Sequence, residues 1–244
     1  MKKTLLTNGC SFTWGGGLPF PEPPMDHERW AKVWPGILSE KIGYNDVNLS
    51  TGCGSNARIF RTTYDWITSQ DPDTLSNTFA IIQFTEPSRY EFYQPEWREW
   101  AKIKIDNSNV WATSYDEQDY LQELSQKRYE TYTPEEGKYS FLSYLFATKS
   151  LLDSHSIPHA FFTYGYIEMG DDYTFVNQNF NWVNHVLELS DFYHMALDNW
   201  GFAEGHTNGE LRDHWDTIPN DGHLSLYGHR EFAEYLEEKL IFNA

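Results

Sequence analysis

Short apolar runs alternate along the chain with longer stretches in which apolar residues recur at helical spacing. The runs are typical of buried strands and span residues 3–8, 46–49, 79–84 and 158–163. The stretches with helical spacing span residues 28–42, 57–69, 139–154 and 226–241. Strands that alternate with helices favour a parallel sheet covered on both faces. We therefore predict a three-layer α/β/α fold with a central parallel sheet.

Residues with known preferences at helix ends support these boundaries. Gly43 is expected to close the first long helix as a C-cap. Pro35 marks either a break in that helix or the first turn of a new one. Ser55 or Asn56 can cap the next helix, and Ser225 can cap the last one.

Residues 90–138 have no clean period and are rich in tyrosine, tryptophan and polar side chains. We interpret them as an insertion of loops and short helices, which could form a cap over a functional site. Residues 181–200 contain a second irregular helical region. No internal repeat, low-complexity run or interdomain linker is visible, so we expect residues 1–244 to form one domain.

The loops that follow parallel strands meet at one edge of the sheet, where ligands bind in open α/β folds. Here these loops contain Gly9-Cys10-Ser11, Gly52-Cys53-Gly54-Ser55-Asn56 and Thr85-Glu86-Pro87-Ser88-Arg89. Ser11 is the candidate nucleophile, although a serine after a strand is more often a helix cap. A nucleophilic serine needs a base within hydrogen-bond reach and benefits from an orienting carboxylate. A loop near the C-terminus offers His223 and Asp221 for these roles.

The order and spacing of these residues resemble the SGNH (GDSL-type) hydrolase superfamily. The first block of that family is a strand followed by Gly-Asp-Ser, and here it stands as a strand followed by Gly9-Cys10-Ser11. The oxyanion glycine of the family is matched by Gly52. The acid and histidine of its last block are matched by Asp221 and His223, the strongest of these matches. The resemblance covers about residues 1–90 and 155–244. It implies a flavodoxin-like fold and a serine esterase.

In that family the serine attacks an ester carbonyl, the histidine takes its proton and the acid orients the imidazole. The resemblance gives these roles to Ser11, His223 and Asp221. It gives the oxyanion to the N–H groups of Ser11 and Gly52, with Thr85 at the position of the family's usual Asn donor.

This sequence departs from the family pattern at three places. Cys10 replaces the usual Asp, and Asn220 stands where many members place the catalytic acid. Thr85 offers a shorter donor than an Asn amide, and losing one oxyanion donor costs roughly 10²–10³ in rate. Asn56 or Arg89 could replace that donor, and both are candidate substrate-binding residues. The alternatives are a plain turn glycine for Gly52, a strand-end cap for Thr85 and a surface salt bridge for Arg89.

The net charge of the chain argues against two classes of binding partner. A net charge of −18 would repel nucleic acid and an anionic membrane surface. No signal segment or transmembrane run is visible, so we expect a cytoplasmic protein, with a virion-associated protein or one released by lysis as the alternatives. Cys10 and Cys53 are too few for a disulfide scaffold; we expect them to lie close together beside the site, with two buried thiols as the alternative.

We expect no cofactor and no metal. A cluster of histidines and aspartates near the C-terminus fits no tight zinc pattern: His206, His214 and His223 with Asp213 and Asp216. The expected substrate is a small acyl ester, with an O-acetyl carbohydrate suggested by family analogy and by the 17% aromatic content. The alternatives are acyl transfer to a sugar, or a weakly catalytic or non-catalytic binding or structural protein on the same scaffold, such as a phage component. The sequence leaves the oligomeric state open.

Overall fold

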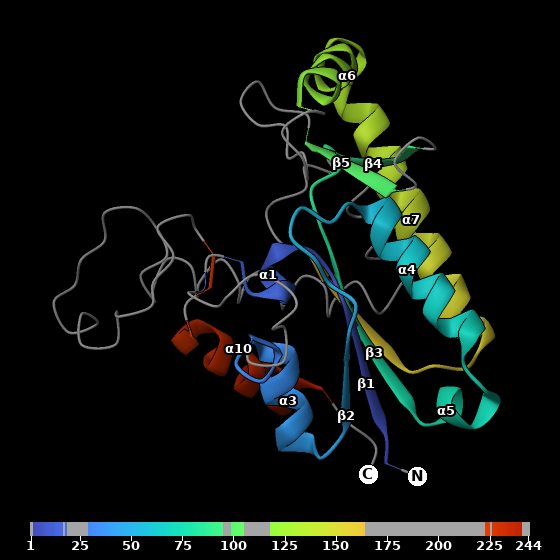
Figure 1. The fold of residues 1–244 in the computed structure, drawn as a ribbon. Helices are drawn as coiled ribbons and strands as arrows, with labels where there is room; N and C mark the ends of the chain where they lie inside the picture. Colours follow the sequence, from blue (N-terminus) through green and yellow to red (C-terminus); the bar gives the residue numbers. More distant parts are fainter. Residues whose placement is uncertain are drawn as a thin grey trace, which may run out of the picture.

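The structure is a computed structural model, and it describes residues 2–16, 18, 29–94, 99–104, 118–163, 223–224 and 226–240. Its centre is a sheet of four parallel strands in the order β2-β1-β3-β6 (Figure 1). The strands are β1 (Thr4–Asn8), β2 (Asn45–Asn48), β3 (Thr78–Phe84) and β6 (His159–Thr163). This arrangement confirms the predicted α/β fold with a central parallel sheet.

Helices cover both faces of the sheet (Figure 1). One face carries α3 (Trp34–Ile42) and α10 (Leu226–Lys239), and the other carries α4 (Asn56–Ser69) and α7 (Pro134–Ser154). Neighbouring residues of a strand point to opposite faces, so Leu5 belongs to the core under α3 and α10 and Leu6 to the core under α4 and α7. Each face therefore has a hydrophobic core of its own.

The parallel register brings the carboxyl ends of the strands to one edge. Asn8 of β1 lies beside Ile82 of β3, and Phe84 at the end of β3 lies beside Thr163 at the end of β6. The short helix α1 (Ser11–Trp14) starts directly after β1 at this edge. The sheet thus places the first, second and third predicted loops on the same side of the molecule.

The helix ends follow the chemistry of their residues. Gly43 closes α3 with φ +72°, a conformation that favours glycine. Pro35 lies in the first turn of α3, so it begins a helix rather than breaking one. The Ser55 hydroxyl caps α4 by accepting a hydrogen bond from the Arg58 N–H at 3.1 Å. These three predictions are confirmed; Ser225 lies outside the described residues.

The prediction of loops and short helices over residues 90–138 is wrong where the structure describes them. The strands β4 (Arg89–Gln94) and β5 (Glu99–Lys104) form an antiparallel hairpin, followed by the helix α6 (Gln118–Thr131). Among the described strands, β4 and β5 pair with each other and not with the central sheet. They therefore lack the apolar runs that are typical of strands buried inside a parallel sheet. The expected cap role stays a prediction, and residues 181–200 lie outside the described part of the chain.

One short helix was missed, and the start of the long helix α7 was placed too late in the chain. Helix α5 (Pro72–Ser76) follows α4, with the Asp71 side chain as its N-cap. Helix α7 begins at Pro134 rather than near Tyr139, because Thr133 caps it by accepting from the Glu136 N–H. Within the described ranges, every helix is too short or too polar to cross a membrane.

Candidate active site

Ser11 and His223 meet at the carboxyl edge of the sheet. The Oγ of Ser11 and the Nε2 of His223 are 2.7 Å apart, although 212 positions separate them in the chain. Ser11 is the first residue of α1, and His223 lies just before α10. A hydroxyl and an imidazole at this distance can exchange a proton. The structure therefore brings these two predicted residues together, while Asp221 lies outside the described residues.

The imidazole of His223 packs against Phe12 of α1 and lies close to Gly16. The Phe12 ring stacks on it, with 4.5 Å between centroids and 29° between the ring planes. On Gly16, a Cβ would lie 2.9 Å from the His223 Nε2 and 3.0 Å from the Ser11 Cβ. The Gly16 N–H donates to the Ser11 carbonyl at 2.7 Å. Only a glycine leaves room for both reacting groups at this position.

The turn that presents Ser11 is fixed by side chains from β1 and β3. The Asn8 Oδ1 accepts from the Gly9 N–H at 2.9 Å, and the Asn8 Nδ2 donates to the Ile59 carbonyl of α4 at 2.9 Å. On Gly9, a Cβ would lie 2.5 Å from the Thr13 Oγ1 and 2.7 Å from the Gln83 Oε1. The Thr13 hydroxyl also donates to that Gln83 oxygen. The chain therefore turns here in one tightly packed conformation.

A buried arginine supports the outer side of α1. The Arg29 guanidinium lies over the Trp14 ring, 3.9 Å from its centroid, and its Nη1 donates to the Gly15 carbonyl at 2.7 Å. Arg29 is only 2% exposed. Stacking and a charge-assisted hydrogen bond together hold the Trp14–Gly15 turn in place.

The loop of the predicted oxyanion glycine lies against the Ser11 loop. The Thr51 N–H donates to the Gly9 carbonyl at 3.4 Å, and a Cβ on Gly54 would lie 3.0 Å from the same oxygen. The Trp14 ring is 3.7 Å from where a Cβ on Gly52 would lie. Gly52 is therefore a neighbour of α1, and its role as an oxyanion donor stays a prediction.

The two cysteines lie in these adjoining loops. Cys10 is buried, Cys53 is partly buried, and they do not form a disulfide. Cys53 has φ +58°, in the left-handed region that non-glycine residues rarely adopt. The loops are in contact, since a Cβ on Gly54 would lie 3.5 Å from the Cys10 Cα. That the two thiols are close to each other stays a prediction.

Thr85 and Asn56 contact each other at the end of β3. The Asn56 Oδ1 accepts from the Thr85 N–H at 2.8 Å, and its Nδ2 donates to the Thr85 carbonyl at 2.9 Å. Asn56 is 3% exposed, so its amide joins the start of α4 to the end of β3. The Thr85 hydroxyl is buried and makes no hydrogen bond with any described residue. Its oxyanion role and the substrate contact of Asn56 stay predictions.

Arg89 forms an ion pair with Glu86, although its side chain is mostly buried and the alternative to substrate binding was a surface salt bridge. Its Nε lies 3.7 Å from the Glu86 Oε2, and its side chain is 10% exposed. The substrate contact expected for Arg89 stays a prediction.

A second histidine lies close enough to His223 for the two charges to interact. His229 of α10 is fully buried, and its Nδ1 accepts from the Trp34 N–H at 3.2 Å. Burial, and then the charge of His223, lower the pKa of His229 to about 3. His229 is therefore neutral near pH 7 and joins α10 to the start of α3.

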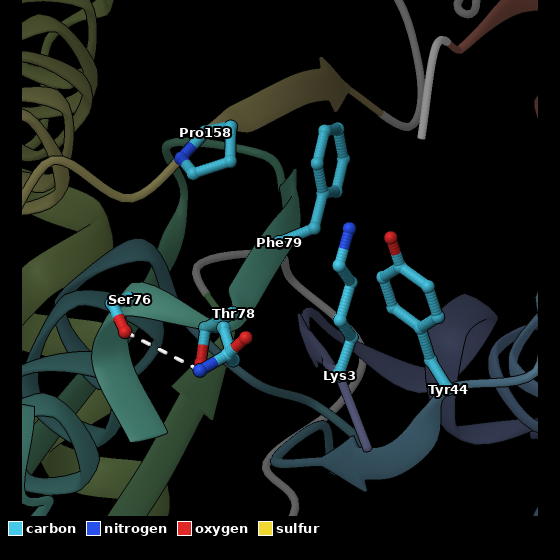
Figure 2. Close-up of a pocket in the computed structure, with 7 residues that line it drawn as sticks. Lys3, Tyr44, Ser76, Thr78, Phe79 and Pro158 are labelled. Atoms are coloured by element: carbon cyan, nitrogen blue, oxygen red, sulfur yellow. Dashed lines mark hydrogen bonds between the residues drawn. The ribbon is translucent and has the colours of Figure 1, made fainter. Parts of the chain in front are cut away.

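A pocket also lies at the opposite edge of the sheet. A pocket of about 190 Å³ is lined by Lys3, Tyr44, Ser76, Asn77, Thr78, Phe79 and Pro158, most of which are seen in Figure 2. These residues lie at the amino ends of the strands, at the edge opposite Ser11.

Among the described residues, no three His, Cys, Asp or Glu side chains are grouped to hold a metal. His206, His214, Asp213 and Asp216 lie outside those residues.

Comparison with known proteins gives a family match and a structural one. A family of unknown function, DUF6071, matches residues 21–196, a stretch that contains neither Ser11 nor His223. No curated protein matches the chain. A solved structure described as "a putative lipolytic protein of G-D-S-L family from Desulfitobacterium hafniense DCB-2" is similar, with 12% sequence identity and a TM-score of 0.44 over 98% of this chain and 100% of that chain.

Proposed function

We propose that this chain, which belongs to the DUF6071 family of unknown function, is a serine esterase. The observation that carries the proposal is the 2.7 Å contact between the Ser11 Oγ and the His223 Nε2. A serine is a weak nucleophile unless a base takes its proton, and the imidazole is within reach to do so. The packing of Phe12 and Gly16 around this pair supports the same role.

In the proposed mechanism, the Ser11 Oγ attacks the ester carbonyl carbon as the His223 Nε2 takes its proton. The tetrahedral oxyanion is held by the N–H groups of Ser11 and Gly52 and by the Thr85 hydroxyl. Collapse breaks the ester bond, and the imidazolium returns the proton to the leaving alcohol. Water then attacks the acyl-enzyme with His223 as base, which releases the acid and restores Ser11. Asp221 orients the imidazole through Nδ1.

The proposed substrate is a small acyl ester, such as an O-acetyl group on a carbohydrate. Gly16 and Phe12 pack directly against the reacting pair, which favours a small acyl group. Two aromatic rings of the hairpin are exposed, Tyr93 at 48% and Trp100 at 40%, with 5.5 Å between their centroids. Exposed aromatic rings offer apolar faces on which a sugar can stack.

Hydrolysis of p-nitrophenyl acetate tests the proposal. We expect wild-type activity to fall by about 10³-fold or more in Ser11→Ala and His223→Ala, because serine and base act as a unit. Ser143→Ala, on the exposed side of α7, is the control and retains full activity. A wild-type protein without activity, or a Ser11→Ala variant that keeps it, would overturn the proposal. Release of acetate from an O-acetylated oligosaccharide tests the substrate class separately.

A further inference from the structure

A lysine of the β4–β5 hairpin reaches the loop that contains Gly52. The Lys102 Nζ donates to the Thr51 Oγ1 at 3.2 Å and to the Gly52 carbonyl oxygen at 3.1 Å. Lys102 belongs to β5 and so to a segment that interrupts the alternation of strands and helices. Its side chain therefore connects the inserted hairpin to the carboxyl edge of the sheet.

The hairpin is held firmly enough to position this lysine. Arg61 of α4 donates from Nε and Nη2 to the two carboxylate oxygens of Glu91, at 2.9 and 2.8 Å. Glu91 is opposite Lys102 in the hairpin register, and its side chain is 2% exposed. The same guanidinium lies over the Trp100 ring, 4.1 Å from its centroid. A bidentate ion pair and a stacked ring are geometrically demanding contacts, so they fix the hairpin against α4.

The two groups held by Lys102 lie on either side of the Gly52 N–H in the chain. That N–H belongs to the peptide between Thr51 and Gly52, and Lys102 binds the Thr51 side chain and the Gly52 carbonyl. Both hydrogen bonds are charge-assisted and therefore stronger than neutral ones. They restrict rotation of this peptide, in a loop whose glycine would otherwise leave it free to turn.

We propose that Lys102 is a positioning residue, which holds the Thr51–Gly52 loop so that the Gly52 N–H faces the oxyanion formed at Ser11. This inference rests on the esterase function proposed above and makes the β4–β5 hairpin part of the active site. It also explains why a hairpin outside the central sheet is joined to the Gly52 loop by a partly buried charge.

The surroundings of Lys102 make its charge sensitive to pH. Burial, and next the positive charge of Arg58, lower the pKa of Lys102, while Cys53 and Glu91 act in the opposite direction. Arg58 approaches from α4, Glu91 from β4 and Cys53 from the loop itself. Loss of the lysine proton at alkaline pH would remove one donor hydrogen and the charge that strengthens both hydrogen bonds. An arginine at the same position would not titrate in that range.

Kinetics of Lys102→Met, Lys102→Arg and wild type with p-nitrophenyl acetate test the inference. We expect Lys102→Met to lower kcat by about 10- to 100-fold with little change in KM, because a misplaced oxyanion donor costs rate rather than binding. Lys102→Arg should recover most of kcat and should lack the fall in kcat at alkaline pH that the wild type shows. Lys127→Met, which removes an exposed lysine of α6, is the control and should match the wild type.

The outcomes separate this inference from the function on which it rests. A wild type without Ser11-dependent activity overturns both. An active wild type with an unchanged kcat in Lys102→Met overturns only the role of Lys102. A Lys102→Met variant that changes KM alone also overturns that role, since the lysine would then bind substrate rather than position the loop. The thermal midpoint of each variant shows that it is folded.

Discussion

At the scale of single residues, the site depends on glycines, which leave space for their neighbours, as well as on the residues that react. Gly9 and Gly16 lie where any Cβ would collide with groups that the chemistry needs. At Gly9 the collision is with Gln83 and Thr13 beneath the turn, and at Gly16 it is with His223 and Ser11 themselves. The first collision would displace the turn that carries the serine, and the second would separate the reacting pair.

Gly16→Ala should therefore impair catalysis far more than folding. The new methyl group would lie 2.9 Å from the His223 Nε2, so the imidazole must move away from Ser11. We expect kcat to fall by about 10²-fold, as a misplacement of about 1 Å can cause. The measurements are kcat for ester hydrolysis and the free energy of unfolding from a denaturation curve of the same variant.

Gly43→Ala is the matched control for this variant. Nothing lies within 4 Å of the position of a Cβ on Gly43, so a methyl group there meets no neighbour, but the φ of +72° makes alanine strained at this position. That strain costs about 1 kcal/mol of stability and leaves kcat unchanged. Equal kcat in Gly16→Ala and wild type would contradict the close packing of Gly16 on the reacting pair.

The residues of the site were predictable to different degrees. Ser11 and His223 could be found because strand ends and a family pattern mark their positions, and the structure brings them within 2.7 Å. Gly16 could not be singled out, because a run of glycines in the sequence does not indicate which groups pack against each of them. The sequence around Lys102 does not mark it as a residue of the site, because its contacts with Thr51 and Gly52 depend on how the hairpin packs in the folded protein.

At the scale of elements, an ion pair between Arg61 of α4 and Glu91 of β4 joins the β4–β5 hairpin to the central fold. Glu91 is nearly buried and Arg61 is 26% exposed, so the pair is shielded from solvent on one side. A buried charge that loses its partner is strongly destabilising, whereas an exposed pair contributes little. The attachment of the hairpin should thus be sensitive to neutralisation of Glu91.

Glu91→Gln should loosen the hairpin and weaken the fold. The variant keeps the shape of the side chain but removes the Glu91 carboxylate from the Arg61 guanidinium. We expect the free energy of unfolding to fall by about 2 kcal/mol. This loss is below the usual range for fully buried pairs because Arg61 is partly exposed. Denaturant unfolding gives the loss, and hydrogen exchange over residues 89–104 shows where it occurs.

Glu123→Gln is the control, since its ion pair with Lys127 lies on the exposed surface of α6. It should leave both the unfolding midpoint and the exchange of residues 89–104 unchanged. Unaltered exchange of the hairpin in Glu91→Gln would contradict the role given to the ion pair.

Elements with local signals were predicted well, and those defined by tertiary contacts were not. Ser55 and Gly43 mark helix ends through their own backbone chemistry, and both act as predicted. Thr133, Pro134 and Glu136 form a helix-start signal at the true beginning of α7, but the apolar periodicity on which the prediction rests begins only near Tyr139. The hairpin could not be recognised by that criterion, since its strands carry charged and aromatic residues rather than an apolar run.

At the scale of the whole molecule, β1 from the first residues of the chain and α10 from the C-terminal part share one hydrophobic core. The strand β1 occupies the inside of the sheet, and α10 packs beside α3 on one face (Figure 1). His229 of α10 accepts a hydrogen bond from the Trp34 N–H of α3 and is fully buried. The position of His223, just before α10, thus depends on how that helix is docked.

This docking should make stability depend on pH through His229. Its folded pKa of about 3 is below the ordinary value of 6.5, so between these values the unfolded chain holds a proton that the folded chain does not. Stability is therefore lost as the pH falls through this window. The contribution of His229 between pH 6.5 and 4 should be about 3 kcal/mol.

The measurement is the free energy of unfolding against pH for wild type and His229→Asn. The asparagine keeps an acceptor for the Trp34 N–H but cannot gain a charge, so the variant should lose less stability than the wild type on acidification. His155→Asn, at the exposed end of α7, should follow the wild type. Parallel curves for wild type and His229→Asn would contradict a buried neutral His229.

The most direct test of the whole account is covalent labelling by a serine-directed fluorophosphonate, followed by mass spectrometry. We predict a single adduct on Ser11 of the native protein, formed much more slowly in His223→Asn and absent in Ser11→Ala. No adduct on the wild type, an adduct at another serine, or an equal rate in His223→Asn would contradict an activated serine at the edge of this sheet.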